Sequence, residues 1–402
     1  MNKLICCLLL VLISQQLMGQ ADLREKHYLY DLDADVQFDH KLVVSGKQGA
    51  LYFKVSLKEG NTIGQYLMRY TKYSIINDVI STSTDTLKIR SSLIAMHKNE
   101  YYFKIGIPLD KVVNFIVVSL SDINSTKKFE FFIPLSTPGS FMPADLIIME
   151  KGRDVPLFKK FLTEKDTFRI VAPFNSAKTA YLFHYEDSFQ PSTPPFILKP
   201  PEGSQELKID STFQIELNTL TTLQRKGLYF IQSDTSQLRG LSMNITDSYF
   251  PKTAQVSKLI DRIIYISTSK EYNLLKEAGT KKAFDTYWMA VSKSKERAVR
   301  IIGNYYTRIT EANQLFSEYK EGWMTDQGMV YTIYGPPNQV VVEMNTETWV
   351  YQKTPNLSKI KFSFVRLKNI FTNNHLVLMR DEEYSQSWFR TIDLWRRGIQ
   401  VN

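Results

Sequence analysis

The sequence predicts a multidomain protein, with two all-β domains of the immunoglobulin-like sandwich type followed by an α+β domain. The 402 residues suffice for two or three domains of ordinary size. From residue 34 to residue 248, short runs of alternating apolar and polar residues are separated by turn residues, which is typical of antiparallel strands. After Pro251 the apolar residues recur every three or four positions, which is typical of helices.

The composition is that of a folded protein that faces water. Apolar residues make up 43% of the chain and charged residues 23%, a balance that excludes wholesale disorder. The 50 Lys and Arg residues exceed the 41 Asp and Glu residues by a net charge of +9. This modest excess over such a length permits an acidic partner but does not require nucleic acid, so we expect no nucleic-acid partner.

Residues 1–19 have the features of a secretory signal peptide. Lys3 supplies a positive charge, ten apolar residues follow from Leu4 to Ile13, and small residues at Gly19 and Ala21 offer cleavage points, with Gly19 the first choice. Ten apolar residues are too few to span a bilayer, and no later run approaches 18, so we expect no transmembrane segment. The protein is therefore expected to be exported, either periplasmic or associated with the outer membrane.

The cysteine count follows from this cleavage. The chain has two cysteines, Cys6 and Cys7, and both lie in the signal segment. The mature protein is then expected to have no disulfide, no cysteine metal site and no thiol nucleophile.

The first β domain is expected over residues 24–137. Its strands include Leu51–Val55, Tyr101–Ile105 and Phe115–Val118, each rich in aromatic and β-branched residues. Three prolines within Pro134–Pro143 break both strand and helix, so this segment is predicted to be a linker, with the first proteolytic cut near Ser136 to Ser140.

The second β domain is expected over residues 144–248. Thr167–Val171, Tyr181–Phe183 and Leu228–Ile231 are predicted strands. The prolines at 191, 194, 195, 200 and 201 mark a stiff surface connection, for which a loop is favoured over a segment that binds a partner.

The third domain, residues 251–402, is expected to begin with helices, continue as a small antiparallel sheet and end with a helix. Thr268 and Glu271 form a capping box, and Gly279 ends that helix. A long amphipathic helix covers Ala298 to Tyr319. Predicted strands are 330–334, 348–352, 360–366 and 376–379, and the final helix is 384–396.

One motif stands out at the end of the long helix, GWMTDQG at residues 322–328. We expect Gly322 to end the long helix or its tail, and Thr325 and Asp326 to cap backbone N–H groups of a tight turn. Gly328 permits either a positive φ or a close backbone approach. Trp323 is predicted to be buried between the helix and the sheet, near Phe316 or Tyr319. The motif and possible interaction residues are Gly322, Trp323, Thr325, Asp326, Gly328, Tyr331, Gly335, Pro336 and Trp349.

These residues resemble a known family. GWMTDQGMVYTIYGPPNQV, followed by ETWVY, resembles the GWxTD domain of exported bacterial proteins common in Bacteroidota. The resemblance extends to Tyr305–Arg308, Ala312–Phe316 and Leu394–Gly398, and covers about residues 270 to 400. It departs at Gln327, where the family usually has Arg, and in the segment after Trp288. It implies an exported, envelope-associated protein with β-sandwich modules before the motif domain, and it implies no reaction.

A search for catalytic chemistry identifies no catalytic, cofactor or metal residues. The five histidines are scattered without ligand spacing, and His184 beside Glu186 is expected to be structural. No HExxH, P-loop or GxSxG motif occurs. Asp326 with Glu343 or Glu347 remains as the carboxylate pair that a glycosidase would need.

Two surface features bear on partners. Lys276 to Arg300 carries seven basic and three acidic residues, which indicates either a docking face for an anionic partner or a solvated helix face with i,i+4 pairs. Asp85-Thr86-Leu87 resembles an O-glycosylation acceptor triplet of the same bacterial group, in an expected loop rich in Ser and Thr.

The expected function is that of a non-catalytic cell-envelope binding or scaffold protein, whose C-terminal domain is the interaction head. Its partner would be an envelope protein or an anionic envelope component. The alternative is a secreted hydrolase that acts on an envelope or dietary glycan with Asp326 in its site. The absence of a nucleophile or metal constellation in the sequence favours the first.

Overall fold

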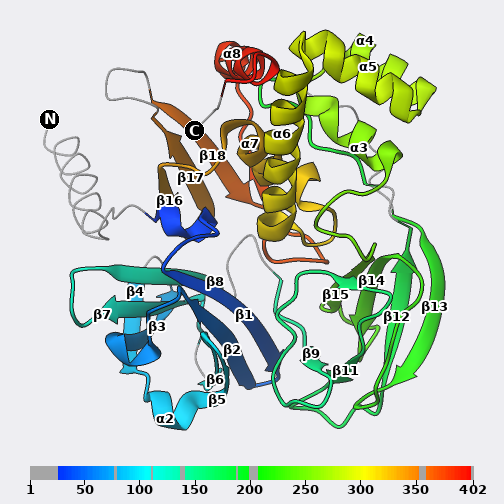
Figure 1. The fold of residues 1–402 in the computed structure, drawn as a ribbon. Coiled ribbons are helices and arrows are strands. Elements are labelled where there is room, and N and C mark those ends of the chain that lie inside the picture. The colour runs from blue at the N-terminus through cyan, green and yellow to red at the C-terminus, as the bar shows by residue number, and fades with distance from the viewer. Residues whose placement is uncertain are drawn as a thin grey trace, which may run out of the picture.

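The computed structural model has two β-rich bodies followed by a body of helices and a sheet, and the three meet around a common centre (Figure 1). The predicted order of all-β domains followed by an α+β region is confirmed. The signal segment 1–19 and the expected cut at Ser136 to Ser140 lie outside the described residues. The structure describes residues 26–76, 79–109, 112–135, 141–186, 189–198, 207–352 and 359–399.

The first β body is a sandwich of two four-stranded antiparallel sheets. Inward-facing residues such as Leu51, Phe53, Phe103 and Ile116 form the core between the sheets. One sheet has the order β1 (Val36–Ser45), β2 (Gln48–Leu57), β6 (Glu100–Pro108), β5 (Leu93–His97). The other has the order β4 (Val79–Thr86), β3 (Tyr66–Ile76), β7 (Phe115–Asp122), β8 (Lys128–Pro134).

The triplet Asp85-Thr86-Leu87 was predicted to lie in a loop, and this prediction was wrong. Asp85 pairs with Tyr70 and Thr86 with Arg69, at the end of edge strand β4. Leu87 follows with 5% of its surface exposed and packs in the sandwich core. The Ser and Thr residues here belong to a strand, where β-branched Thr is well accommodated.

The second β body has a five-stranded sheet packed on a two-stranded one. Phe168, Leu182, Ile231 and Ile245 form its core. The larger sheet has the order β10 (Leu162–Thr163), β15 (Leu241–Thr246), β14 (Gly227–Gln232), β12 (Thr179–Tyr185), β13 (Ile209–Glu216). The smaller sheet pairs β11 (Phe168–Val171) with β9 (Ile147–Glu150).

The two β bodies share an apolar contact. Tyr52 and Tyr102 of the first body belong to one buried cluster with Ile147, Met149 and Phe158 of the second. Burial of these side chains supplies a hydrophobic driving force that holds the bodies together.

The third body begins with helices and continues with a four-stranded antiparallel sheet. A turn of 3-10 helix, η4 (Gly322–Met324), separates two of the helices. Among the described residues, no helix is both long and apolar enough to cross a membrane. The helices are α3 (Val256–Arg262), α4 (Ser269–Ala278), α5 (Lys281–Ser292), α6 (Lys295–Phe316), α7 (Asp326–Tyr334) and α8 (Tyr384–Arg396). The sheet has the order β16 (Gln339–Val342), β17 (Thr346–Tyr351), β18 (Ile360–Arg366), β19 (Leu376–Leu378).

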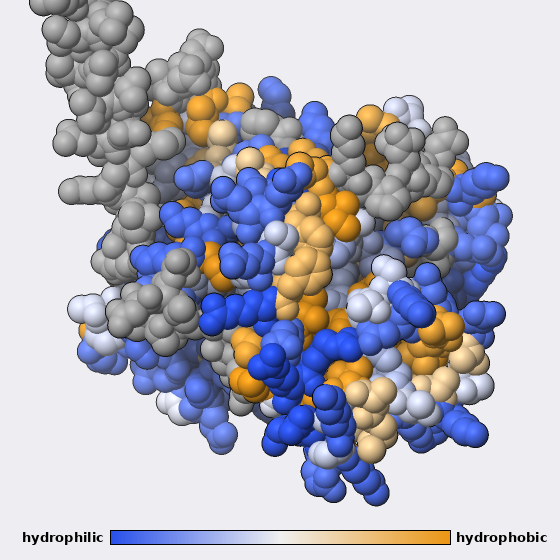
Figure 2. Space-filling model, turned by 90° about the horizontal axis from the view of Figure 1, so that it is seen from above, coloured by the Kyte–Doolittle hydropathy of each residue, from blue (hydrophilic) through white to orange (hydrophobic). Residues whose placement is uncertain are grey.

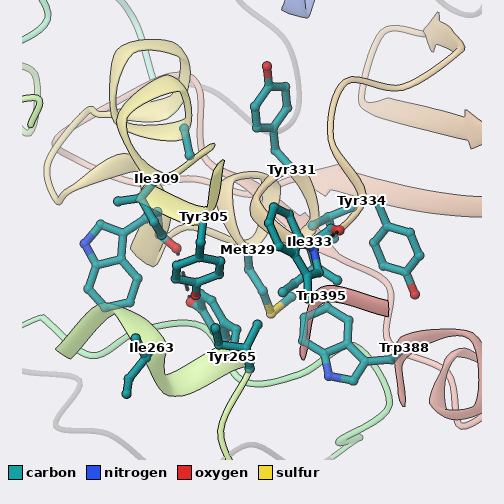
Figure 3. Close-up of a cluster of buried hydrophobic side chains, with 14 of the residues drawn as sticks. Ile263, Tyr265, Tyr305, Ile309, Met329, Tyr331, Ile333, Tyr334, Trp388 and Trp395 are labelled. Carbon is teal, nitrogen blue, oxygen red and sulfur yellow. Dashed lines mark hydrogen bonds between the residues drawn. The ribbon is translucent and has the colours of Figure 1, made fainter. Parts of the chain in front are cut away.

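The prediction that residues 330–334 form a strand was wrong, because they belong to helix α7. All nine residues of α7 are buried, so the segment has no exposed polar face to mark a helical period. Thr325 caps its first turn, since the Thr325 hydroxyl accepts the Gly328 N–H at 2.9 Å. The helix therefore occupies the centre of the third body, where Met329, Ile333 and Tyr334 face side chains of α6 and α8 (Figure 3).

The capping box of α4 is confirmed. Thr268 and Glu271 exchange backbone and side-chain hydrogen bonds, and Gly279 ends the helix with a φ of 58°. Glu271 also pairs with Arg396 of α8 at 2.7 Å. The hydrogen bond from Arg396, with a smaller contribution from the Thr268 N–H, lowers the pKa of Glu271 to about 2.

This lowered pKa predicts a pH-dependent contribution to stability. The native state favours ionised Glu271, so its contribution is present above the unfolded pKa of 4.5 and is lost as the pH falls towards 2. We expect Glu271→Gln to lower the melting temperature at pH 6, and this difference from the parent to shrink below pH 4.5. Thermal unfolding of both chains across this range is the measurement. If the two chains differ in melting temperature by the same amount at pH 6 and at pH 2, the destabilisation comes from packing and not from the charge of Glu271.

Candidate functional site

The motif turn is held by side chains that bond its own backbone. The Gly322 N–H donates to the Ser317 hydroxyl at 2.9 Å, and the Trp323 N–H donates to the Asn313 side-chain oxygen at 3.1 Å. The Thr325 hydroxyl donates to the Gly322 carbonyl at 2.8 Å while it caps α7. The turn's polar groups are thus satisfied internally, as buried backbone requires.

The two motif glycines are required by close backbone approach, and neither has a positive φ. A Cβ on Gly328 would lie 1.8 Å from the Gly322 carbonyl oxygen. A Cβ on Gly322 would lie 2.1 Å from the carbonyl oxygen of Ala312 in α6. Helix α6, the turn and helix α7 are therefore stacked at distances that exclude a side chain.

Trp323 is buried, with 2% of its surface exposed, but its neighbour differs from the prediction. Its ring lies 5.9 Å from that of Tyr265, edge to face, and the Tyr265 hydroxyl donates to the Trp323 carbonyl at 3.1 Å. The indole N–H donates to Glu321 at 2.7 Å. Phe316 instead contacts the rings of Tyr30, Tyr331 and Trp349, because the chain turns between residues 316 and 323.

Asp326 does not cap the turn, contrary to the prediction, because Thr325 already does so. Its carboxylate accepts the Leu378 N–H of β19 at 2.9 Å and pairs with Arg380 at 2.6 Å. Arg380 also donates to the Thr193 carbonyl at 3.2 Å. Asp326 therefore joins α7 to the sheet. Through Arg380 it also joins α7 to the proline-rich connection at Thr193.

The proline-rich connection lies against the motif. The Ser192 N–H and hydroxyl both donate to the Met324 carbonyl at 3.0 Å. The Asp381 N–H donates to the Pro195 carbonyl at 3.1 Å. The described residues 189–198 form a loop, as predicted, and this loop is docked on the third body.

Loss of the Asp326 carboxylate is expected to destabilise the third body. Asp326→Ala leaves Arg380, whose side chain is 13% exposed, without its carboxylate and the Leu378 N–H without an acceptor. We expect the free energy of unfolding to fall by about 2–3 kcal/mol. Urea unfolding followed by tryptophan fluorescence measures this. The control is Asp285→Ala, which removes an exposed i,i+4 pair and should cost less than about 0.5 kcal/mol. Equal losses in both variants would contradict the assignment.

Glu347 belongs to a different network. It accepts hydrogen bonds from the Tyr30 hydroxyl at 2.5 Å, the Trp349 indole N–H at 2.6 Å and the Gln327 amide at 3.1 Å. Burial raises its pKa, and these donors oppose the shift. The structure thus gives Asp326 and Glu347 separate partners, and Glu343 accepts from Thr346 in the adjoining turn.

Trp349 anchors the start of the first body. Its side chain is fully buried, and its ring lies 4.8 Å from that of Tyr30 in η1 (His27–Tyr30). Gln327 also donates to the Tyr30 hydroxyl at 3.1 Å. Two of the motif-domain residues therefore hold a segment that lies about three hundred residues earlier in the chain.

A cleft of about 590 Å³ lies between α6, the turn that follows α7 and the C-terminal end of α8. Its polar lining comes from one face of α6 together with Asp31 and Asn338, and Trp395 contributes an aromatic wall. Of the predicted motif residues, Pro336 lines the cleft directly. The residues of α6 in its wall include Arg300, Asn304, Thr307, Arg308 and Glu311.

Arg308 is held in this wall by three neighbours. It pairs with Glu311 at 3.1 Å, and its guanidinium lies 5.4 Å from the centre of the Tyr331 ring. The Tyr331 hydroxyl donates to Glu311 at 3.4 Å, and burial followed by the negative Glu311 raises the pKa of Tyr331 well above its usual value. A Cβ on Gly335 would approach the Arg308 guanidinium to 3.1 Å, at a positive φ of 83°.

The predicted motif residues therefore fall into two groups. Gly322, Trp323, Thr325, Asp326, Gly328 and Trp349 form internal contacts, whereas Tyr331, Gly335 and Pro336 support or line the cleft. The cleft residues of α6 were not predicted as a site from the sequence. Their spacing of four, three, one and three residues along a polar helix face was the signal available, because such residues lie on one side of a helix.

The basic stretch from Lys276 to Arg300 ends in the wall of the cleft, which Arg300 lines. Lys276 pairs with Asp261, and Lys281 with Asp285 at 2.6 Å. The other five basic side chains, at positions 282, 293, 295, 297 and 300, have no ion pair within the described parts of the chain. Figure 2, which views the side uppermost in Figure 1, shows a mostly hydrophilic surface crossed by a band of hydrophobic residues.

The described residues contain no group of three or more side chains that could hold a metal ion. His184 pairs with Asp210 at 3.2 Å, and its other ring nitrogen lies 2.9 Å from the Lys226 carbonyl. This buried histidine is thus held on both sides by β-body residues, and Asp210 takes the place of the expected neighbour Glu186.

Comparison with known proteins gives one family match. Residues 227–397 match the family model described as the GWxTD domain. The match begins in β14, earlier than the predicted boundary at 251. No curated protein matches the chain. A solved structure of the C-terminal 282-residue fragment of intimin, in complex with the intimin-binding domain of its translocated receptor, is 12% identical. It covers 87% of this chain and 95% of its own, and its TM-score of 0.13 is too low to carry an argument.

Proposed function

We propose that this chain, which carries a GWxTD domain at residues 227–397, is a non-catalytic binding or scaffold protein of the cell envelope. The GWxTD domain is its interaction head, and the cleft beside α6 is the binding surface. The observation that carries this proposal is the division of the motif. Its carboxylate and indole groups are engaged in internal contacts, while Arg308 and Pro336 line an accessible cleft.

The two β bodies act as a platform for this head. Their shared apolar cluster and the docked loop at 189–198 fix the head relative to the sandwiches. Such a platform presents the cleft in one orientation, which reduces the conformational entropy that this chain loses when a partner binds.

Export is part of the proposal. The basic, then apolar, then small-residue order of residues 1–19 supports cleavage near Gly19 and a periplasmic or outer-membrane-associated location. The partner is accordingly an envelope protein or another anionic envelope component. The unpaired basic residues that lead to Arg300 favour a partner with negative charge at the Arg300 end of the cleft.

A charge-reversal experiment tests the head. We expect the parent chain to capture a reproducible partner from envelope extracts and Arg300→Glu to lose it, because the cleft then repels an anionic group. The matched control is Arg390→Glu, which makes the same charge change on exposed α8 of the same domain. It should retain the partner. Equal retention by both variants, or capture that ignores salt concentration, would contradict the proposal.

A further inference from the structure

We propose that the hollow where the three bodies meet binds a small organic anion, a carboxylate or phosphate carried on an apolar body. This cavity of about 420 Å³ is separate from the cleft beside α6 and goes beyond the proposed function. Its volume lies in the usual range of small-ligand sites, about 300–1,000 Å³. Each of the three bodies contributes to its wall: β1 of the first, the segment 157–162 of the second, and β18 with the following turn of the third.

Cationic side chains enter the cavity from all three bodies. Lys41 comes from the first body, Lys160 and Arg239 from the second and Arg366 from the third. The positions are far apart in the sequence, so only the assembled bodies bring them together. A ligand that engages them would be bound by the folded arrangement of the whole chain.

The anionic side chains of the cavity do not balance this charge. Asp39 is paired at 3.2 Å with Lys54, which lies outside the cavity wall. Glu347 already accepts hydrogen bonds from three donors, the Tyr30 hydroxyl, the Trp349 indole N–H and the Gln327 amide. Glu318 is the remaining carboxylate, and it accepts from the Thr372 hydroxyl at 3.2 Å. The cavity therefore retains an excess of positive charge.

Two of the cations have donor groups without an acceptor. The Arg366 side chain is only 5% exposed, and its Nε–H is buried without a hydrogen-bond partner. Its Nη1 donates to the Asn373 carbonyl at 2.5 Å. The Lys41 side chain is half-buried and has no hydrogen bond or ion pair of its own within the described residues. Burial lowers its pKa, and the negative charges of Glu318 and Asp39 oppose this shift. Buried polar groups are normally bonded, so these two sites call for an acceptor that the chain does not supply.

His40 lies beside these positive charges. His40 also lines the cavity, its side chain is exposed on the surface of β1, and the positive charges of Lys41, Lys160 and Arg366 disfavour its protonated form. His40 is therefore neutral at pH 7 and adds no charge. It offers an imidazole that can bond an anion's oxygen as an uncharged donor.

The remaining wall is aromatic. Phe38 and Phe131 of the first body are stacked with ring centres 4.4 Å apart. Phe141 and Phe371 also line the cavity. These rings suit an apolar body, while a guanidinium and an ammonium suit a carboxylate or phosphate group. The pairing of the two chemistries selects an amphipathic anion over a free inorganic ion.

The test compares ligands that differ only in charge. Octanoate and octyl phosphate represent the two anionic groups, and 1-octanol is the uncharged control of the same chain length. Isothermal titration calorimetry on the mature full-length chain should show saturable binding of at least one anion. We expect 1-octanol to bind about tenfold more weakly or worse, the effect of one charge-assisted contact. Equal affinity for 1-octanol, or no binding of either anion, would overturn the proposal.

A pair of variants locates the site. Lys41→Gln removes a half-buried cation that has no structural partner, and it should weaken binding of the preferred anion about tenfold. Lys47→Gln makes the same change on an exposed turn of the same sandwich, outside the cavity, and should leave affinity unchanged. Circular dichroism checks that both variants fold. If the two variants bind equally well, or lose affinity equally, the anion site is not in this cavity.

Discussion

Replacing Trp323 with alanine is expected to lower the free energy of unfolding by about 3–5 kcal/mol, the range for loss of a large buried aromatic side chain. The indole is 2% exposed, and it packs edge to face on Tyr265. Its removal leaves a cavity between η4 and the helices, and it also removes the donor that bonds Glu321. Because Glu321 pairs with Arg262, whose side chain is 2% exposed, the loss extends to a buried ion pair.

The chain offers a selective probe for this experiment. All five tryptophans, at positions 288, 323, 349, 388 and 395, lie in the third body, so tryptophan fluorescence reports its unfolding. Phe389→Ala is the control, since that ring is 58% exposed and should cost little. If Trp323→Ala melts like the parent yet loses its envelope partner, the motif is a recognition surface and the internal assignment is wrong.

Local signals in the sequence predicted the elements whose ends are set by neighbouring residues. The capping box of Thr268 and Glu271, the stop at Gly279 and the cap at Thr325 all occur as expected. The final helix has the predicted bounds, Tyr384 to Arg396. Each of these features depends on contacts within four residues, which a pattern can encode.

Helix α7 was mispredicted because burial on every side removes the pattern. In Met329 to Tyr334, β-branched and aromatic residues favour a strand by propensity, and no polar face marks the helical period. Tertiary packing around the segment overrides that preference. The same burial explains why Trp323 packs on Tyr265, since the path of the chain between the two helices is not encoded locally.

The partners of Asp326 and Glu347 could not be predicted for a different reason. Arg380 lies 54 residues after Asp326, and Tyr30 lies 317 residues before Glu347. Side-chain pairing at such separations depends on the docking of whole bodies. The motif could therefore be identified as a turn from the sequence. The side-chain contacts that connect it to distant segments could be identified only in the folded structure.

Alanine at Gly328 is expected to have an effect of comparable size, about 3 kcal/mol or more, through overpacking. The added Cβ would lie 1.8 Å from the Gly322 carbonyl oxygen and 2.6 Å from its carbon. These are backbone atoms of a turn that is held by hydrogen bonds at Gly322, Thr325 and Gly328, so relief of the clash must shift η4 or α7 as a unit.

Gly303→Ala provides the matched comparison within the same domain. Gly303 is an exposed position inside α6, and a Cβ there would meet nothing within 4 Å. This variant should raise stability by about 0.5–1 kcal/mol, because alanine is the better helix residue. Urea unfolding followed by tryptophan fluorescence measures both variants. Opposite signs for Gly328→Ala and Gly303→Ala establish that close packing of α6, the turn and α7 requires the motif glycine. If Gly328→Ala lowers the free energy of unfolding by less than about 1 kcal/mol, the turn can move to accommodate a Cβ. Close backbone approach would then not explain the glycine at this position.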